Sequence, residues 1–138
     1  MSQIFIAVFV GDPLDYAKKR HTAVYVTFPD GDQSLLHIVG SHGFFEYKDE
    51  VGKDPQASAR LATLIHVSTL TKTTSKPDIK AACQRTKIWN ELGHRDWNCQ
   101  NWVGDALDGL VAIGCVTAEE RRGAVDKMVE ACVEAKDG

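Results

Sequence analysis

Segments with the pattern of β-strands occupy the first half of the chain, and segments with the pattern of helices occupy the second half. The expected strands are rich in β-branched and aromatic residues and lie at 4–10, 21–28, 34–39, 44–47 and 61–70. Residues 48–60 are charged and are expected to form an exposed loop. Because the strands precede the helices, the order predicts an α+β fold. It would have an antiparallel sheet of four or five strands packed against C-terminal helices.

Three helices are expected after residue 70. Ser75 can cap the first helix, and Gly93 would end it. The second helix is expected to begin after Asn98, where apolar residues recur with helical spacing. A capping-box sequence at 117–120 opens the third helix, which is amphipathic and is expected to continue to residue 136.

Composition limits the functions open to the chain. Its 138 residues, 43% hydrophobic and 25% charged, suit a single domain that spans residues 1–138. The net charge of −3 removes the usual electrostatic basis for binding nucleic acid, and no apolar run approaches the length of a membrane span. The four cysteines lack CxxC spacing and no secretory signal is evident. A cytoplasmic protein with reduced thiols and no cofactor is therefore expected.

A thiol stands at the expected start of the second helix. Asn98 is a favoured N-cap residue, so Cys99 takes the first helical position. Unpaired amides and the positive end of the helix dipole stabilise a thiolate there, which predicts a lowered pKa for Cys99. Its spacing from Trp102 and Val103 places Cys99 on the inward face of the helix. The same pattern also fits a small buried core cysteine.

Two histidines in adjacent expected strands are the candidate partners of this thiol. His21 begins one strand, and His37 lies among aliphatic residues in the next. A three-residue loop, Pro29-Asp30-Gly31, places Pro where a type I turn favours it and Gly at the left-handed position. With this register His37 opposes Ala23, and the two histidines lie diagonally on one face, ~7–8 Å apart at Cα. A satisfied core histidine is the alternative for His37.

Three segments together resemble a known enzyme family. They are His21-Thr22-Ala23-Val24-Tyr25-Val26, Leu36-His37-Ile38 and Asn98-Cys99-Gln100-Asn101-Trp102-Val103. In this order they are similar to the histidine strand, the second-histidine strand and the nucleophile motif of the lecithin:retinol acyltransferase-like proteins. That group is the circularly permuted branch of the NlpC-type thiol hydrolases, in the papain-like superfamily. The resemblance spans residues 21–103. It implies a permuted papain-like fold, with the cysteine helix packed on the histidine strands.

The resemblance also implies roles for individual residues. Cys99 would be the nucleophile, His21 the base and His37 the residue that orients His21, in acyl transfer through a thioester to water, an amine or an alcohol. Backbone amides at the start of the Cys99 helix would hold the oxyanion. Lipid-acting members of that family commonly carry a C-terminal hydrophobic anchor, whereas an amphipathic helix is expected here. The expected substrate is therefore a small-molecule or peptide-like amide, ester or thioester. The residues expected to line its site are Tyr25, His42, Trp97 and Gln100.

Three other interpretations use the same features. His21, His37 and Cys99 could ligate zinc, since two imidazoles and a thiolate suit that ion. A relative of the same fold without activity could serve as a binding module. The acidic face of the last helix could place the chain in a larger assembly, and the sequence leaves the oligomeric state open.

Overall fold

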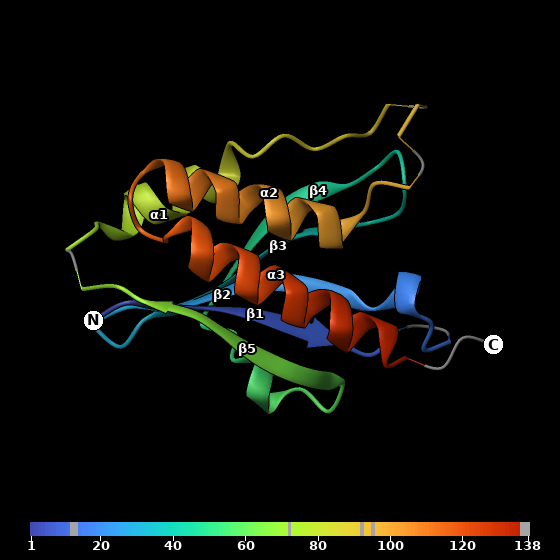
Figure 1. Cartoon of the computed structure of the whole chain (residues 1–138), viewed down its shortest axis with the longest axis horizontal. Coiled ribbons are helices and arrows are strands. Elements are labelled where there is room, and N and C mark those ends of the chain that lie inside the picture. The colour runs from blue at the N-terminus through green and yellow to red at the C-terminus, as the bar shows by residue number, and fades with distance from the viewer. Residues whose placement is uncertain (12–13, 72, 92, 95, 136–138) are drawn as a thin grey trace.

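The computed structural model describes residues 1–11, 14–71, 73–91, 93–94 and 96–135, which form a five-stranded antiparallel sheet followed by three helices (Figure 1). The strands are β1 (Gln3–Phe9), β2 (His21–Thr27), β3 (Gln33–Val39), β4 (Glu46–Val51) and β5 (Leu61–Thr69), in the spatial order β4-β3-β2-β1-β5. The helices are α1 (Lys76–Gln84), α2 (Cys99–Ala112) and α3 (Ala118–Val133), with short 3-10 turns η1 (Ala17–Lys19) and η2 (Pro55–Ala57). The predicted α+β class is confirmed.

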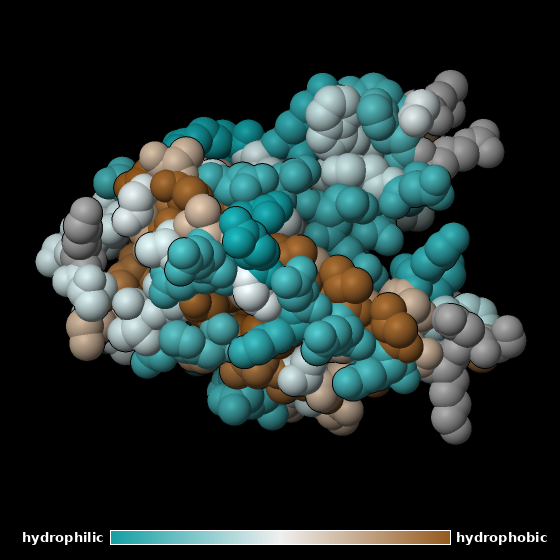
Figure 2. Space-filling model, viewed as in Figure 1, coloured by the Kyte–Doolittle hydropathy of each residue, from teal (hydrophilic) through white to brown (hydrophobic). Residues whose placement is uncertain are grey.

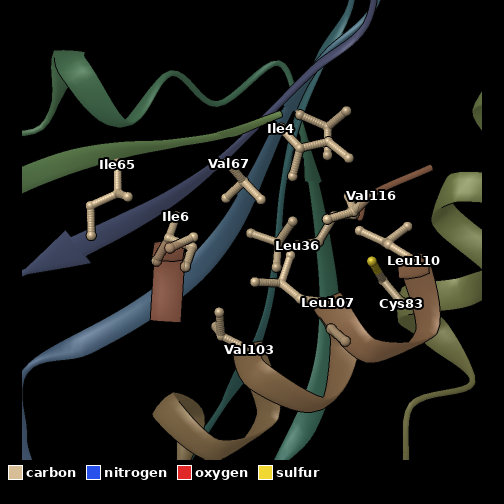
Figure 3. Packing of buried hydrophobic residues seen from close by; sticks show 14 of the residues in the cluster. Ile4, Ile6, Leu36, Ile65, Val67, Cys83, Val103, Leu107, Leu110 and Val116 are labelled. Atoms are coloured by element: carbon tan, nitrogen blue, oxygen red, sulfur yellow. The ribbon is translucent and has the colours of Figure 1, made fainter. Parts of the chain in front are cut away.

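One face of the sheet carries the main hydrophobic core, against which α2 and α3 pack. Val24 of β2 and Leu36 of β3 are fully buried on this face. Figure 3 shows Leu36 beside Val103 and Leu107 of α2. Each such side chain stabilises the fold by about 1.5–3 kcal/mol relative to its exposed state. Packing on this face therefore fixes α2 against the two strands that carry the histidines.

The opposite face of the sheet carries a second, smaller cluster. It consists of Ala7, Ala23, Tyr25 and Leu35, all buried. Because successive side chains of a strand point to opposite faces, His21 shares the face of Ala23 and Tyr25. The His21 side chain therefore projects from the face of the sheet that does not carry α2.

The β2–β3 hairpin has the predicted three-residue loop. The Phe28 N–H donates to the Asp32 carbonyl at 2.8 Å, and Gly31 adopts the left-handed conformation with φ 90°. Pairing continues in that register until Val24 opposite Leu36, where the ladder between the two strands ends. The predicted register is confirmed. Beyond Val24 and Leu36, toward His21 and His37, β2 and β3 no longer pair with each other.

The fourth strand differs from the prediction. β4 begins at Glu46 and ends at Val51, rather than spanning 44–47, so part of the predicted loop at 48–60 is strand. It pairs with β3 and lies at the edge of the sheet, with Lys48 opposite His37. A charged sequence can form this strand because an edge strand has solvent along one side.

The first helix is shorter than predicted. α1 ends at Gln84, and the Thr86 hydroxyl donates to the Ala82 carbonyl at 2.9 Å just beyond the helix end. The chain that follows is held on the β3–β4 connection instead of extending the helix to Gly93. There the Asn90 side chain accepts the Phe45 N–H at 2.9 Å and donates to the Phe45 carbonyl at 3.1 Å.

The other two helices begin where the sequence predicts. α2 follows its N-cap Asn98. α3 follows Thr117, whose hydroxyl accepts the Glu120 N–H at 3.1 Å while the Glu120 carboxylate accepts the Thr117 N–H at 2.9 Å. α3 ends at Val133, and its predicted end at residue 136 lies outside the described residues. Among the described helices, none is both long and apolar enough to cross a bilayer.

Candidate active site

The N-cap of α2 places Cys99 at the first helical position, as predicted. Asn98 Oδ1 accepts the Gln100 N–H at 2.9 Å, and Asn101 Oδ1 accepts the Asn98 N–H at 3.0 Å. This reciprocal cap satisfies amides that the first turn of a helix would otherwise leave unpaired. Trp102, three residues beyond Cys99, is fully buried. The cap and the buried indole together fix the thiol at the margin of the core.

The Cys99 sulfur lies against the main chain of β2 on both sides of His21. The thiol donates toward the Arg20 carbonyl at 3.8 Å, and the Thr22 N–H points at the sulfur. Burial raises the pKa of Cys99. The backbone N–H and the side chain of Thr22, and the backbone N–H groups of Cys99 and Gln100, oppose that shift only in part. The predicted lowering of this pKa is therefore wrong, because desolvation outweighs the helix N-terminus at this position.

His21 and His37 form a directly hydrogen-bonded pair. His21 Nε2 lies 2.7 Å from His37 Nδ1, and the ring centroids are 4.9 Å apart. Burial lowers the pKa of His21 to about 4, and the charge on His37 acts in the same direction. Burial also lowers the pKa of His37, against the opposing charge of Glu50. Both imidazoles are therefore neutral at pH 7.

Glu50 of β4 is a member of this site that the sequence analysis missed. Its Oε2 lies 3.2 Å from His37 Nε2, and its carboxylate also pairs with Lys48 and Lys53, each at 3.1 Å. Burial alone would raise the pKa of Glu50, but hydrogen bonds from the two lysines hold it below its usual value. The signal that could have found it is the alternation through 47–50, which places Lys48 and Glu50 on one face if that stretch is read as a strand.

One cleft of about 1230 Å³ is lined by His21, His37 and Cys99 together. His21 and His37 project from the face of the sheet opposite α2, whereas the Cys99 thiol lies on the face that α2 covers. The two sides meet where the β2–β3 ladder has ended, beyond Val24 and Leu36. Within the described residues no hydrogen bond joins the sulfur to either imidazole.

The walls of this cleft differ in chemistry. The lining includes Lys18 and Lys19 of η1, Asp96 just before α2, and Asp105 in the middle of α2. The α3 wall is apolar, and Figure 2 shows hydrophobic surface gathered over the C-terminal half of this helix. Its lining includes Val125, Met128, Val129 and Val133. The cleft can therefore accept a molecule that has both polar and apolar parts.

Comparison with known proteins identifies a family. Residues 8–117 match the family described as "Family of unknown function (DUF6540)". The chain belongs to the DUF6540 family. The part of this DUF6540 chain that matches runs from the end of β1 to the cap of α3, and it contains Cys99 and both paired histidines. No curated protein and no solved structure gives a significant match.

Three of the four residues expected to line the substrate site of the DUF6540 chain do line the cleft: His42, Trp97 and Gln100. The His42 ring packs edge-on against Phe45, and the Trp97 indole N–H donates to Asp105 at 3.4 Å. Tyr25 does not line the cleft. It is buried in the smaller hydrophobic cluster, on the face of the sheet opposite α2, where its hydroxyl donates to the Gln33 side chain. That expectation is wrong because sharing a face with His21 does not bring Tyr25 near the end of the strand.

The Gln100 side chain of α2 hydrogen-bonds to η1 and the residue after it, which form one wall of the cleft. Its side-chain amide donates to the Ala17 carbonyl at 2.9 Å and to the Arg20 carbonyl at 3.2 Å. The amide nitrogen therefore holds η1 in place rather than projecting toward a substrate. The other three cysteines are buried: Cys83, Cys115 and Cys132.

The histidine pair does not fit the zinc alternative. Two nitrogens that share a tetrahedral zinc ion at its usual bond lengths lie about 3.3 Å apart and both point at the metal. His21 Nε2 and His37 Nδ1 instead lie 2.7 Å apart and bond to each other. Among the described residues, no three His, Cys, Asp or Glu side chains are grouped in a way that could hold a metal ion.

Proposed function

We propose that this DUF6540 chain is a cysteine-nucleophile acyl-transfer enzyme with the circularly permuted papain-like arrangement of the NlpC-type thiol hydrolases. The observation that carries the proposal is the 2.7 Å contact between His21 Nε2 and His37 Nδ1 in the cleft that also holds Cys99. An imidazole that is oriented by a second group, in one cleft with a thiol at a helix N-terminus, supplies the groups that activate a cysteine nucleophile.

In the proposed reaction, His21 takes the thiol proton of Cys99 as the sulfur attacks the carbonyl carbon of the substrate. A carbon–sulfur bond forms, and the carbonyl π electrons move to the oxygen to give a tetrahedral oxyanion. His21 then gives the proton to the leaving amine, alcohol or thiol as its bond to carbon breaks, which leaves an acyl-Cys99 thioester. Water or another acceptor next loses a proton to His21 and attacks the thioester, and that proton returns to the departing sulfur.

The backbone N–H of Cys99 is the proposed oxyanion donor. The Asn98 side chain accepts the Gln100 N–H, and the Asn101 side chain accepts the Asn98 N–H, so the cap uses the amides on either side. The Cys99 N–H stands between them at the positive end of the helix dipole. Losing one such donor typically costs about 2.7–4 kcal/mol of transition-state stabilisation.

The proposed substrate class is a small-molecule or peptide-like amide, ester or thioester. Such a molecule has a polar carbonyl group for the α2 end of the cleft and a side group that can meet the apolar α3 wall. The lysines of η1 and the carboxylates of Asp96 and Asp105 favour a substrate with polar groups as well, since both signs of charge line the cleft.

Intact-mass measurement tests the proposal directly. The folded chain is incubated with panels of activated acyl esters, amides and thioesters, and a covalent acyl adduct is expected on Cys99. Peptide mapping assigns the position. The adduct should be absent from a Cys99→Ala variant and retained in Cys132→Ala, a control that removes another cysteine lining the same cleft. No adduct with any class from a folded sample would contradict acyl transfer.

The pH dependence of Cys99 alkylation is a second expected result. Because burial raises the pKa of the thiol and lowers the pKa of His21 to about 4, the resting pair is a neutral thiol and a neutral imidazole. The rate of alkylation by iodoacetamide should therefore rise with pH and still be rising at pH 9.0. Cys83, whose pKa burial raises to about 12, should react far more slowly. A reactivity plateau below pH 7 would instead reveal a thiolate–imidazolium pair and contradict this assignment.

A binding module without activity is the second candidate, and one observation favours it. The sulfur bonds toward the Arg20 carbonyl rather than to an imidazole. In a binding module the neutral thiol would be a packing group, and the cleft would hold a ligand without covalent change. Saturable binding of acyl compounds in the same panels, with no mass adduct on Cys99, would select this candidate.

A further inference from the structure

The charged edge strand β4 meets the histidine pair from the side opposite the thiol. Glu50 Oε2 lies 3.2 Å from His37 Nε2, and His37 Nδ1 lies 2.7 Å from His21 Nε2. The three groups thus stand in a row that uses both nitrogens of the His37 ring. The two imidazoles share a hydrogen bond, whereas Glu50 Oε2 and His37 Nε2 lie at ion-pair distance without the geometry of a hydrogen bond. The row ends at His21 Nδ1, the one imidazole nitrogen of the pair that neither of these contacts uses.

We propose that Glu50 is a positioning residue that fixes the tautomer of His37 and, through His37, the tautomer of His21. Its catalytic use rests on the proposed acyl transfer, whereas the tautomers themselves do not. In this arrangement His37 carries its proton on Nε2 and His21 carries its proton on Nε2. His21 Nδ1 is left as the nitrogen with the free electron pair.

The assignment follows from the donors and acceptors of each group. An ionised carboxylate carries no proton, and its negative charge 3.2 Å from His37 Nε2 favours the ring proton on that nitrogen over a lone pair facing the carboxylate. A neutral imidazole has one N–H, so His37 Nδ1 must accept. His21 Nε2 is then the donor of the 2.7 Å bond, and His21 Nδ1 is unprotonated. This is the protonation state that a general base requires.

The charges around His37 support a carboxylate at this position. Lys48 and Lys53 both contact Glu50 at 3.1 Å and hold its pKa below the usual value, against the effect of burial. The groups that face His37 are His21 from β2, Lys48 and Glu50 from β4, and Lys53 from the segment after β4. Burial keeps the His37 ring neutral at pH 7, so the single-proton assignment applies.

Removing the Glu50 carboxylate should exchange the protonated and unprotonated nitrogens of both imidazoles. In a Glu50→Ala variant the lysine ammonium groups become the nearest charged partners of His37, and an ammonium can only donate. His37 Nε2 would then accept, Nδ1 would carry the proton, and His21 Nε2 would become an acceptor. The lone proton of His21 would move to Nδ1, and His21 could no longer act as a base toward Cys99.

Nitrogen-15 NMR of the full-length chain tests the inference, because two-bond couplings identify which ring nitrogen carries the proton. At pH 7 the expected pattern is protonated Nε2 and unprotonated Nδ1 for both His21 and His37. Glu50→Ala should exchange these assignments, and Glu50→Asp should restore them in part. A matched control, Glu46→Ala, removes an exposed carboxylate of the same strand and should leave both tautomers unchanged.

Three results would overturn the proposal. One is a wild-type spectrum with the proton on His37 Nδ1, which needs no variant. Another is an unchanged His21 tautomer in a folded Glu50→Ala variant. The third is a reversal of the tautomers in Glu46→Ala. These outcomes are independent of acyl transfer, because the spectrum is recorded without substrate. The expected tautomers combined with no acyl adduct would contradict the proposed function and leave the positioning role of Glu50 in place.

Discussion

A His21→Ala variant should acylate Cys99 about 10²–10⁴ times more slowly than the wild-type chain, because it loses the proposed general base. The measurement is the single-turnover rate of adduct formation with the best acyl compound found, followed by intact mass at pH 7. His66→Ala is the matched control, since His66 is an exposed histidine of the same sheet that does not line the cleft. A His21→Ala rate within threefold of wild type would contradict the role of His21.

The free energy of unfolding of His21→Ala should also depend on pH differently from that of the wild-type chain, and this difference can be measured without substrate. The pKa of His21 is about 4 in the folded chain and about 6.5 when unfolded, so the unfolded state binds the extra proton. This linkage makes wild-type stability fall as pH drops from about 6.5 toward 4, by at most ~3.4 kcal/mol. His21→Ala should lose less stability over that interval in urea unfolding. An identical pH dependence in both chains would mean that His21 is not held neutral.

The hairpin shows how much of the site the sequence can predict. Pro29-Asp30-Gly31 determines the loop length through local backbone preferences, and the loop length determines the register. The register in turn places His21 and His37 on one face, where they form the 2.7 Å contact. The N-cap of Cys99 is equally local, because Asn98 bonds within the first turn of its own helix. These two features, each set by neighbouring residues, are predicted correctly from the sequence.

The features that sequence analysis missed depend on contacts between distant segments. Glu50 lies in a strand because β4 pairs with β3, which its own charged sequence does not favour. The segment after the early end of α1 is held by Asn90, which bonds the Phe45 main chain across 45 positions. The pKa of Cys99 follows burial against β2 rather than the helix dipole. Tyr25 shares a face with His21 but lies about 13 Å farther along the strand.

A Trp102→Ala variant should lose about 3–5 kcal/mol of unfolding free energy, a large share of the ~5–15 kcal/mol typical of a domain. Trp102 is fully buried in α2, and its ring lies 5.9 Å from that of Tyr47 in β4. Truncation leaves a cavity between the helix and the sheet, one turn from Cys99. Urea unfolding at pH 7, monitored by circular dichroism, measures the change.

Trp102→Phe is the variant that shows which part of the indole matters. The Trp102 Nε1 atom is buried with no hydrogen-bond partner among the described residues, so replacing the indole by a benzyl ring removes an unsatisfied donor as well as some volume. Trp102→Phe should therefore cost much less than Trp102→Ala. Because the same indole anchors the first turn of α2, the alanine variant should also lose the selective alkylation of Cys99 over Cys132. An alanine variant within 1 kcal/mol of wild type would contradict the role of this side chain in fixing α2, and with it the position of the thiol.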